Sequence, residues 1–147
     1  MAYDRKQDEG REQVAPPDGS LVDYRLELGR VFVPVGPART CVVLDPSRAE
    51  VVRAWADAVI PRRGERPAAS EVGAAEYIDA TVFAAPRLRA LLLEGVDQVE
   101  RAARERHGQP FTSCDAATRT DLLRELEAAD GRVGECFAMV QTLTYEA

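Results

Sequence analysis

The chain has 147 residues, of which 46% are hydrophobic and 30% are charged, and its formal net charge is −6. This balance is typical of a globular protein long enough for one core, and it excludes a chain that is disordered throughout or embedded in a membrane. The net negative charge argues against nucleic-acid binding, because contacts to phosphate dominate the affinity of such proteins. The basic residues are nearly all arginines, and they are spread among acidic residues without forming a basic stripe.

Neither the N-terminus nor the cysteines indicate a secreted protein. Residues 1–20 predict a flexible polar tail that lacks the apolar run of a secretory signal peptide. No later stretch approaches the length of an apolar membrane span. Cys41, Cys114 and Cys136 are odd in number and far apart in the sequence. We therefore interpret them as buried or partly buried thiols in a reducing compartment, and not as a disulfide framework.

Residues 21–46 predict a strand-like arm or a small β-meander. Three runs in this segment have the alternation or β-branched content of strands: 21–28, 31–35 and 40–44. Gly29 and Arg30 fit a hairpin turn with glycine first, and Pro34 predicts an edge strand because proline cannot donate a ladder hydrogen bond. So small a sheet is marginal alone, and we expect it to lie on the helices or on a partner.

Residues 47–147 predict a helical domain with about five helices, so the fold class is mainly α. The apolar residues recur at helical spacing, and proline, glycine and capping residues separate the helices. The residues that mark the helix ends are, in chain order, Ser47 with Glu50 as a capping box, Pro61, Ser70, Pro86, Gly108, Thr112 with Asp115 as a second cap, and Gly131. A charged loop is expected at 62–67, directly after the first helix.

The sequence contains no motif of a catalytic centre. His107 is the only histidine, and it lies at a predicted helix C-terminus, far from any cysteine that would complete a familiar zinc site. Glu76 and Asp79 lie three apart on one helical face and offer two oxygen ligands, but hard cations usually need more. Neither a Gly-x-Ser-x-Gly elbow nor a glycine-rich phosphate loop is present. We therefore assign no catalytic, cofactor-binding or metal-binding residue to this chain.

Four short motifs, in a fixed order, carry a family resemblance. They are Ala56-Asp57-Ala58-Val59-Ile60-Pro61, then Tyr77-Ile78-Asp79, then Gly108-Gln109-Pro110-Phe111, and finally the stretch from Ala116 to Leu123 with Arg119 and two leucines. This order resembles the small subunit, subunit 3, of the gluconate 2-dehydrogenase family. The likeness covers roughly residues 48–147.

The resemblance implies a non-catalytic helical subunit that accompanies a large flavoprotein of the glucose-methanol-choline oxidoreductase type. In that family the large subunit holds FAD and oxidises a sugar or sugar acid, and the small subunit resembles a stability or maturation partner. The small subunit often carries a twin-arginine export signal, which is missing from this sequence. We therefore expect a cytoplasmic location, and a periplasmic one only if the chain is exported with a partner.

Part of the apolar surface would then contact the flavoprotein, although a complete core explains the same residues. The candidate interface residues are Val31, Phe32, Val33, Trp55, Tyr77, Phe111 and Phe137. Two other functions stay open: a self-associating helical scaffold, and an independent enzyme or metal-binding protein that uses the carboxylates or His107. Asp57 is also interpreted as a ligand of backbone amides in the 62–64 turn, and Asp79 as a residue that holds a loop.

Overall fold

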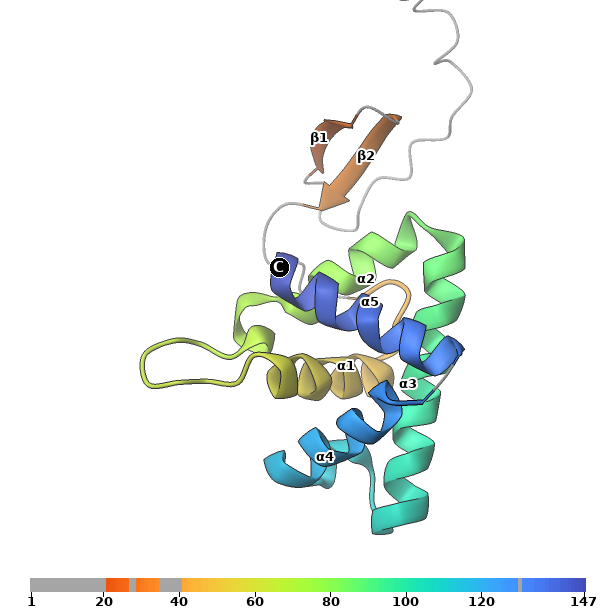
Figure 1. Ribbon diagram of the computed structural model, residues 1–147. Helices are drawn as coiled ribbons and strands as arrows, with labels where there is room; N and C mark the ends of the chain where they lie inside the picture. Colours follow the sequence, from red (N-terminus) through yellow and green to blue (C-terminus); the bar gives the residue numbers. More distant parts are fainter. Residues whose placement is uncertain (1–20, 27–28, 35–40, 130) are drawn as a thin grey trace, which may run out of the picture.

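The protein is mainly helical in the residues that the computed structural model describes, which are 21–26, 29–34, 41–129 and 131–147, with side chains described from 41 onward (Figure 1). The five helices are α1 (Pro46–Val59), α2 (Ala74–Phe83), α3 (Pro86–His107), α4 (Ala116–Glu127) and α5 (Arg132–Glu146). Two short 3-10 turns, η2 (Ala69–Val72) and η3 (Phe111–Ser113), precede α2 and α4, and two strands, β1 (Leu21–Leu26) and β2 (Gly29–Pro34), precede α1. The predicted tail at 1–20 lies outside the described residues.

The arm before α1 differs from the expected three-stranded meander. β1 and β2 pair antiparallel, with Leu26 opposite Gly29 and Arg25 opposite Arg30. The predicted turn at Gly29 and Arg30 is therefore wrong, because both residues belong to β2. The described part of the predicted third strand, 41–44, is not a strand, because three of its four amides bond to a single carboxylate and are not available to a β-ladder.

The first helix begins earlier than the sequence predicted. The Oδ1 atom of Asp45 accepts the backbone amide of Arg48 at 2.9 Å, and Pro46 occupies the first turn. The predicted capping box of Ser47 and Glu50 is thus wrong. Aspartate caps as well as serine does, and proline is preorganised for the first helical position, so the Asp-Pro pair sets the start of α1.

The other predicted helix boundaries are confirmed except where a 3-10 turn intervenes. Ser70 does not cap α2, because it lies in η2 and the chain reaches α2 only after Gly73, whose φ of 89° suits glycine. Asp115 caps α4 through the amide of Thr118 at 2.8 Å, whereas Thr112 belongs to η3. The boundaries at Pro61, Pro86, Gly108 and Gly131 all fall next to a helix end.

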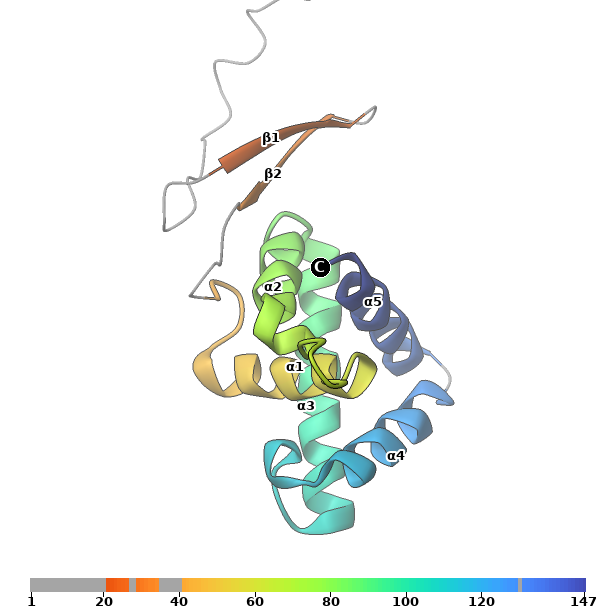
Figure 2. The same ribbon diagram turned by 90° about the vertical axis from the view of Figure 1, so that its left-hand side faces the viewer.

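The core forms where α1 crosses the long helix α3 and α5 covers both, as the two views show (Figures 1 and 2). Trp55 of α1 lies at its centre with 2% of its surface exposed, and its ring centroid is 5.8 Å from that of Phe137 on α5. Phe111 is fully buried. These three aromatic residues were candidates for the partner interface, and that assignment is corrected here, because their own chain already covers them.

Helices α3 and α5 approach most closely at Gly95 and Cys136. A Cβ atom added to Gly95 would lie 2.0 Å from the sulfur and 2.9 Å from the Cβ atom of Cys136, and 3.9 Å from the Trp55 ring. Both distances to Cys136 are below ordinary contact distance, so only glycine fits at position 95 without a shift of one helix. Glycine inside a helix is unfavourable by about 1 kcal/mol relative to alanine. The close packing of α3 and α5 therefore requires glycine at position 95, despite its low helix propensity.

The substitution Gly95→Ala should lower the free energy of unfolding by about 1–3 kcal/mol, because overpacking outweighs the gain in helix propensity. Urea unfolding followed by circular dichroism measures the change. Adding Cys136→Ala removes the nearest atom, so the double variant should lose less than the sum of the single losses. A Gly95→Ala protein as stable as the parent would contradict the close approach.

Candidate functional site

A buried carboxylate on α2 holds the segment that enters the helical domain. Asp79 is 2% exposed. Its Oδ2 atom accepts the amide of Val42 at 2.7 Å, and its Oδ1 atom accepts the amides of Val43 and Leu44 at 2.9 and 2.8 Å. Three donated amides replace the water that a carboxylate loses on burial. The prediction that Asp79 holds a loop is confirmed, and the loop is the one that precedes α1.

A second carboxylate on the same helix face binds an arginine of α1. The Oε1 atom of Glu76 accepts from both Nε and Nη2 of Arg53, at 3.2 and 2.6 Å, and Arg53 also contacts Glu50 on its own helix. The hydrogen bonds that Arg53 donates to Glu76 raise the pKa of Arg53, so the guanidinium stays charged. This ion pair ties α1 to α2. Glu76 and Asp79, the candidate oxygen ligands of a metal, thus both already have partners within the protein.

Asp57 joins the end of α1 to η2. Its Oδ1 atom accepts the backbone amide of Ser70, and its Oδ2 atom accepts the hydroxyl of the same residue, each at 2.8 Å. The expected role, binding backbone amides near the end of α1, is confirmed, but the predicted partner in the 62–64 turn is wrong. Ser70 presents an amide and a hydroxyl together, which satisfies both carboxylate oxygens at once.

The remaining candidates for chemistry lie apart from these carboxylates. His107 is exposed in the last turn of α3, where a cationic side chain suits the helix dipole. Within 41–129 and 131–147, no three residues among His, Cys, Asp and Glu lie close enough together to hold a metal ion.

The cysteines behave as structural thiols. Cys114 and Cys136 are buried and Cys41 is half-buried, and all three are free, as the sequence predicted. Burial raises the pKa of Cys136 to about 12. Burial also raises the pKa of Cys41 to about 12, with further contributions from the nearby charges of Asp79 and Glu76. Since the thiolate is the reactive form, neither side chain is a nucleophile near neutral pH.

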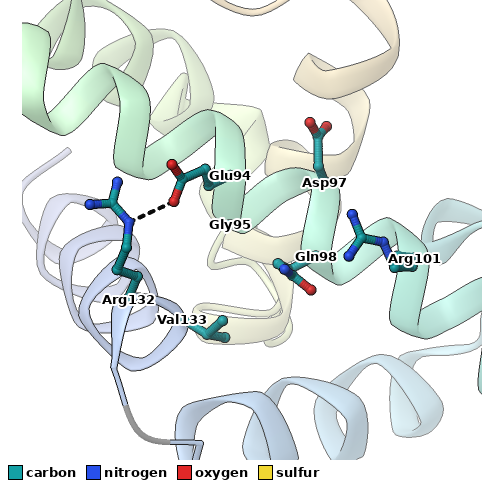
Figure 3. A pocket seen from close by; sticks show the side chains of 7 residues that line it. All are labelled: Glu94, Gly95, Asp97, Gln98, Arg101, Arg132 and Val133. Atoms are coloured by element: carbon teal, nitrogen blue, oxygen red, sulfur yellow. Dashed lines mark hydrogen bonds and ion pairs between the residues drawn. The ribbon is translucent and has the colours of Figure 1, made fainter.

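A groove of about 320 Å³ lies between α3 and the start of α5 (Figure 3). The salt bridge between Arg132 and Glu94, at 2.6 Å, crosses one end of the groove, and Asp97 points toward Arg48 of α1, to which it is bonded. Binding pockets for small molecules are usually concave and mostly apolar, with a few converging polar groups. The charged groups of this groove do not converge on one point, because Glu94 pairs with Arg132 and Asp97 pairs with Arg48 of α1, so we assign no substrate or cofactor to it.

The large exposed apolar side chains lie on or around α2. Phe83 ends α2, Val72 lies in the η2 turn that contacts α2, and Tyr145 lies on α5, which also packs on α2; their exposed fractions are 36%, 56% and 66%. Val42, which is 54% exposed, also lies near α2, because its backbone amide binds Asp79 of that helix. Among the predicted interface residues, Tyr77 of α2 is half-buried, and Val31, Phe32 and Val33 belong to β2, where no side chain is described.

Sequence reasoning missed two arginines that hold the domain together. Arg53 is one, because its partner Glu76 lies 23 residues away. Arg119 is the other: it donates to the carbonyl oxygens of Phe111 and Thr112, and its guanidinium lies 5.8 Å from the centre of the Phe111 ring. In the sequence, Arg119 stands out only as part of the motif that follows Phe111, and this position does not indicate which groups Arg119 would bind.

The substitution Asp79→Asn should lower the free energy of unfolding by about 1–3 kcal/mol, because one amide donor would then face an NH₂ group instead of an oxygen. Hydrogen exchange of the amides of residues 42–44 should accelerate in the same variant. Asp97→Asn is the matched control, since Asp97 forms an exposed ion pair with Arg48 that contributes little. Equal stability of the two variants, with amides 42–44 still protected, would contradict the role of Asp79.

Comparison with known proteins gives one family. No helix among the described residues is both long and apolar enough to cross a membrane. No curated protein and no solved structure matches the chain significantly. The model of the family described as gluconate 2-dehydrogenase subunit 3 matches residues 46–147, which is the whole helical domain from the first residue of α1 onward. The chain therefore belongs to the gluconate 2-dehydrogenase subunit 3 family.

Proposed function

We propose that this protein is a non-catalytic accessory subunit of a flavin-dependent sugar or sugar-acid dehydrogenase complex. In this proposal the chain supports the folding, stability or maturation of a large subunit of the glucose-methanol-choline oxidoreductase type, and that subunit binds FAD. Membership of a family described as a dehydrogenase subunit supports a role inside a complex. The partner, its FAD and the oxidation of a sugar are parts of the proposal.

The proposal rests on what the side chains of the motif residues contact. Asp57 binds the amide and hydroxyl of Ser70, and Asp79 binds three amides of the segment before α1. Phe111 is fully buried, and Arg119 holds its carbonyl oxygen. Residues that perform chemistry must reach a substrate, whereas each of these contacts the chain itself. The motif thus supports a scaffold whose function lies in its surface.

The surface around α2 is our candidate for contact with the flavoprotein. Interfaces are enriched in aromatic residues and depleted in charge at their centre, and the exposed Phe83 and Tyr145 both belong to α2 or its neighbour α5. Tyr77 is half-exposed on the same helix. β2, which contains the predicted interface residues Val31, Phe32 and Val33, also contacts α2.

Co-expression tests the proposal. A flavoprotein of the glucose-methanol-choline type from the same organism should be recovered in several-fold larger amount, with bound flavin and dehydrogenase activity, when the two are expressed together. The readouts are soluble flavoprotein, flavin absorbance per polypeptide, and dye reduction with sugar substrates. A partner that binds only the folded flavoprotein stabilises its folded state by mass action, so more of it should stay folded in the complex.

Two controls make this test specific. Asp97→Asn should support the flavoprotein as well as the parent chain does, because it alters only an exposed ion pair. Tyr145→Ser, which removes a largely exposed ring, should weaken support without unfolding the chain. A flavoprotein that is equally soluble, flavin-loaded and active without this chain would refute the accessory role.

A further inference from the structure

A charged loop stands out from the surface between α1 and η2. Residues 61–67, with the sequence Pro-Arg-Arg-Gly-Glu-Arg-Pro, are all exposed. Figure 1 shows this segment extending from the end of α1 well beyond the helices, and Figure 2 views it nearly end-on. The loop carries three arginines against one glutamate, in a chain whose net charge is −6. Its charge is therefore opposite to that of the protein as a whole.

The loop has a defined conformation although its tip contacts no other element. Arg63 and Arg66 exchange both backbone hydrogen bonds, each at 3.1 Å, across a two-residue turn. Gly64, first in that turn, has a φ of 60°, which matches the mirror-type hairpin turn that places glycine first. At the base, the amide of Ala69 bonds to the carbonyl of Ile60 at 3.0 Å. The loop is thus a short β-hairpin and not a loose connection.

Side-chain contacts fix the base of this hairpin to the helical domain. Glu71 accepts the amide of Ala68 at 2.7 Å and pairs with Arg62. Asp57 binds Ser70 just beyond the loop. Arg62 therefore stabilises the base of the hairpin. The two arginines nearest its tip are Arg63 and Arg66.

The hairpin holds two like charges, Arg63 and Arg66, directly opposite each other. Residues that exchange both hydrogen bonds in an antiparallel pair lie directly opposite each other, and like charges in that arrangement are destabilising. Neither Arg63 nor Arg66 forms an ion pair with any residue in the described part of the chain. A carboxylate-rich partner surface would remove the repulsion, and guanidinium groups bind carboxylates in a bidentate manner.

We propose that the 61–67 hairpin is a docking element that inserts Arg63 and Arg66 into an acidic surface of the flavoprotein subunit. This inference rests on the proposed function for the identity of the partner. The preformed turn lowers the ordering cost of binding. Opposite charge speeds association and selects the partner, and it makes the affinity dependent on salt.

Charge reversal tests the docking element. The parent chain, Arg63→Glu/Arg66→Glu and the control Arg101→Glu/Arg124→Glu are each titrated against the purified flavoprotein by calorimetry at two salt concentrations. The control changes the net charge equally at exposed positions on α3 and α4. The loop variant should bind about tenfold more weakly and with a smaller salt dependence. The control should change affinity by about twofold at most.

A photo-cross-linking residue gives an independent readout of contact. Placed at position 63 it should cross-link to the flavoprotein, and placed at position 101 it should not. Binding of the loop variant as tight as that of the control would overturn the docking element and leave the accessory role standing. A parent chain that does not bind the flavoprotein would instead refute the accessory role itself, and the docking proposal with it. Retention of an RNA or DNA oligonucleotide by the parent chain, lost in the loop variant, would also overturn the proposal.

Discussion

The buried carboxylate of Asp79 is the contact on which the arrangement of the described domain depends. It accepts three consecutive amides from residues 42–44, and so fixes the direction in which the chain enters α1. A lone buried charge is very costly, and only a full set of donors makes it stable. The buried carboxylate therefore depends on these three amides, which replace the water that it loses.

Helix α2, which carries Asp79, connects most parts of the protein. It packs against α1, α3, α5 and η2, and β2 lies beside it. One turn before Asp79, Glu76 binds Arg53 of α1. Polar contacts thus fix α2 on one side, while the apolar residues Ile78 and Val82 are fully buried in the core. Helix α2 is consequently held on several sides, and the exposed aromatic residues around it are presented on a rigid support.

The sequence predicts what is local and misses what is distant. Pro61, Pro86 and Gly108 mark helix ends through their own backbone restrictions, so those boundaries follow from the sequence. The run at 40–44 has the β-branched content that predicts a strand, but the amides of residues 42–44 bind a carboxylate 35 to 37 residues away. Trp55 and Phe137 were assigned to an interface for the same reason: an apolar stripe does not tell whether its own chain or a partner covers it.

The motif carboxylates and the hairpin arginines differ in whether the chain itself supplies their bonding partners. The carboxylates Asp57 and Asp79 receive amide and hydroxyl donors from the chain itself, so they contribute to its fold. Arg63 and Arg66 are held opposite each other at the tip of a projecting hairpin, where they repel and stabilise nothing that the structure describes. A sequence selected for stability alone gains nothing from this pair. Because the turn beneath the arginines is formed before any partner arrives, acidic groups of the proposed partner would offset their charge without first ordering the loop, which is the advantage of a preformed docking element.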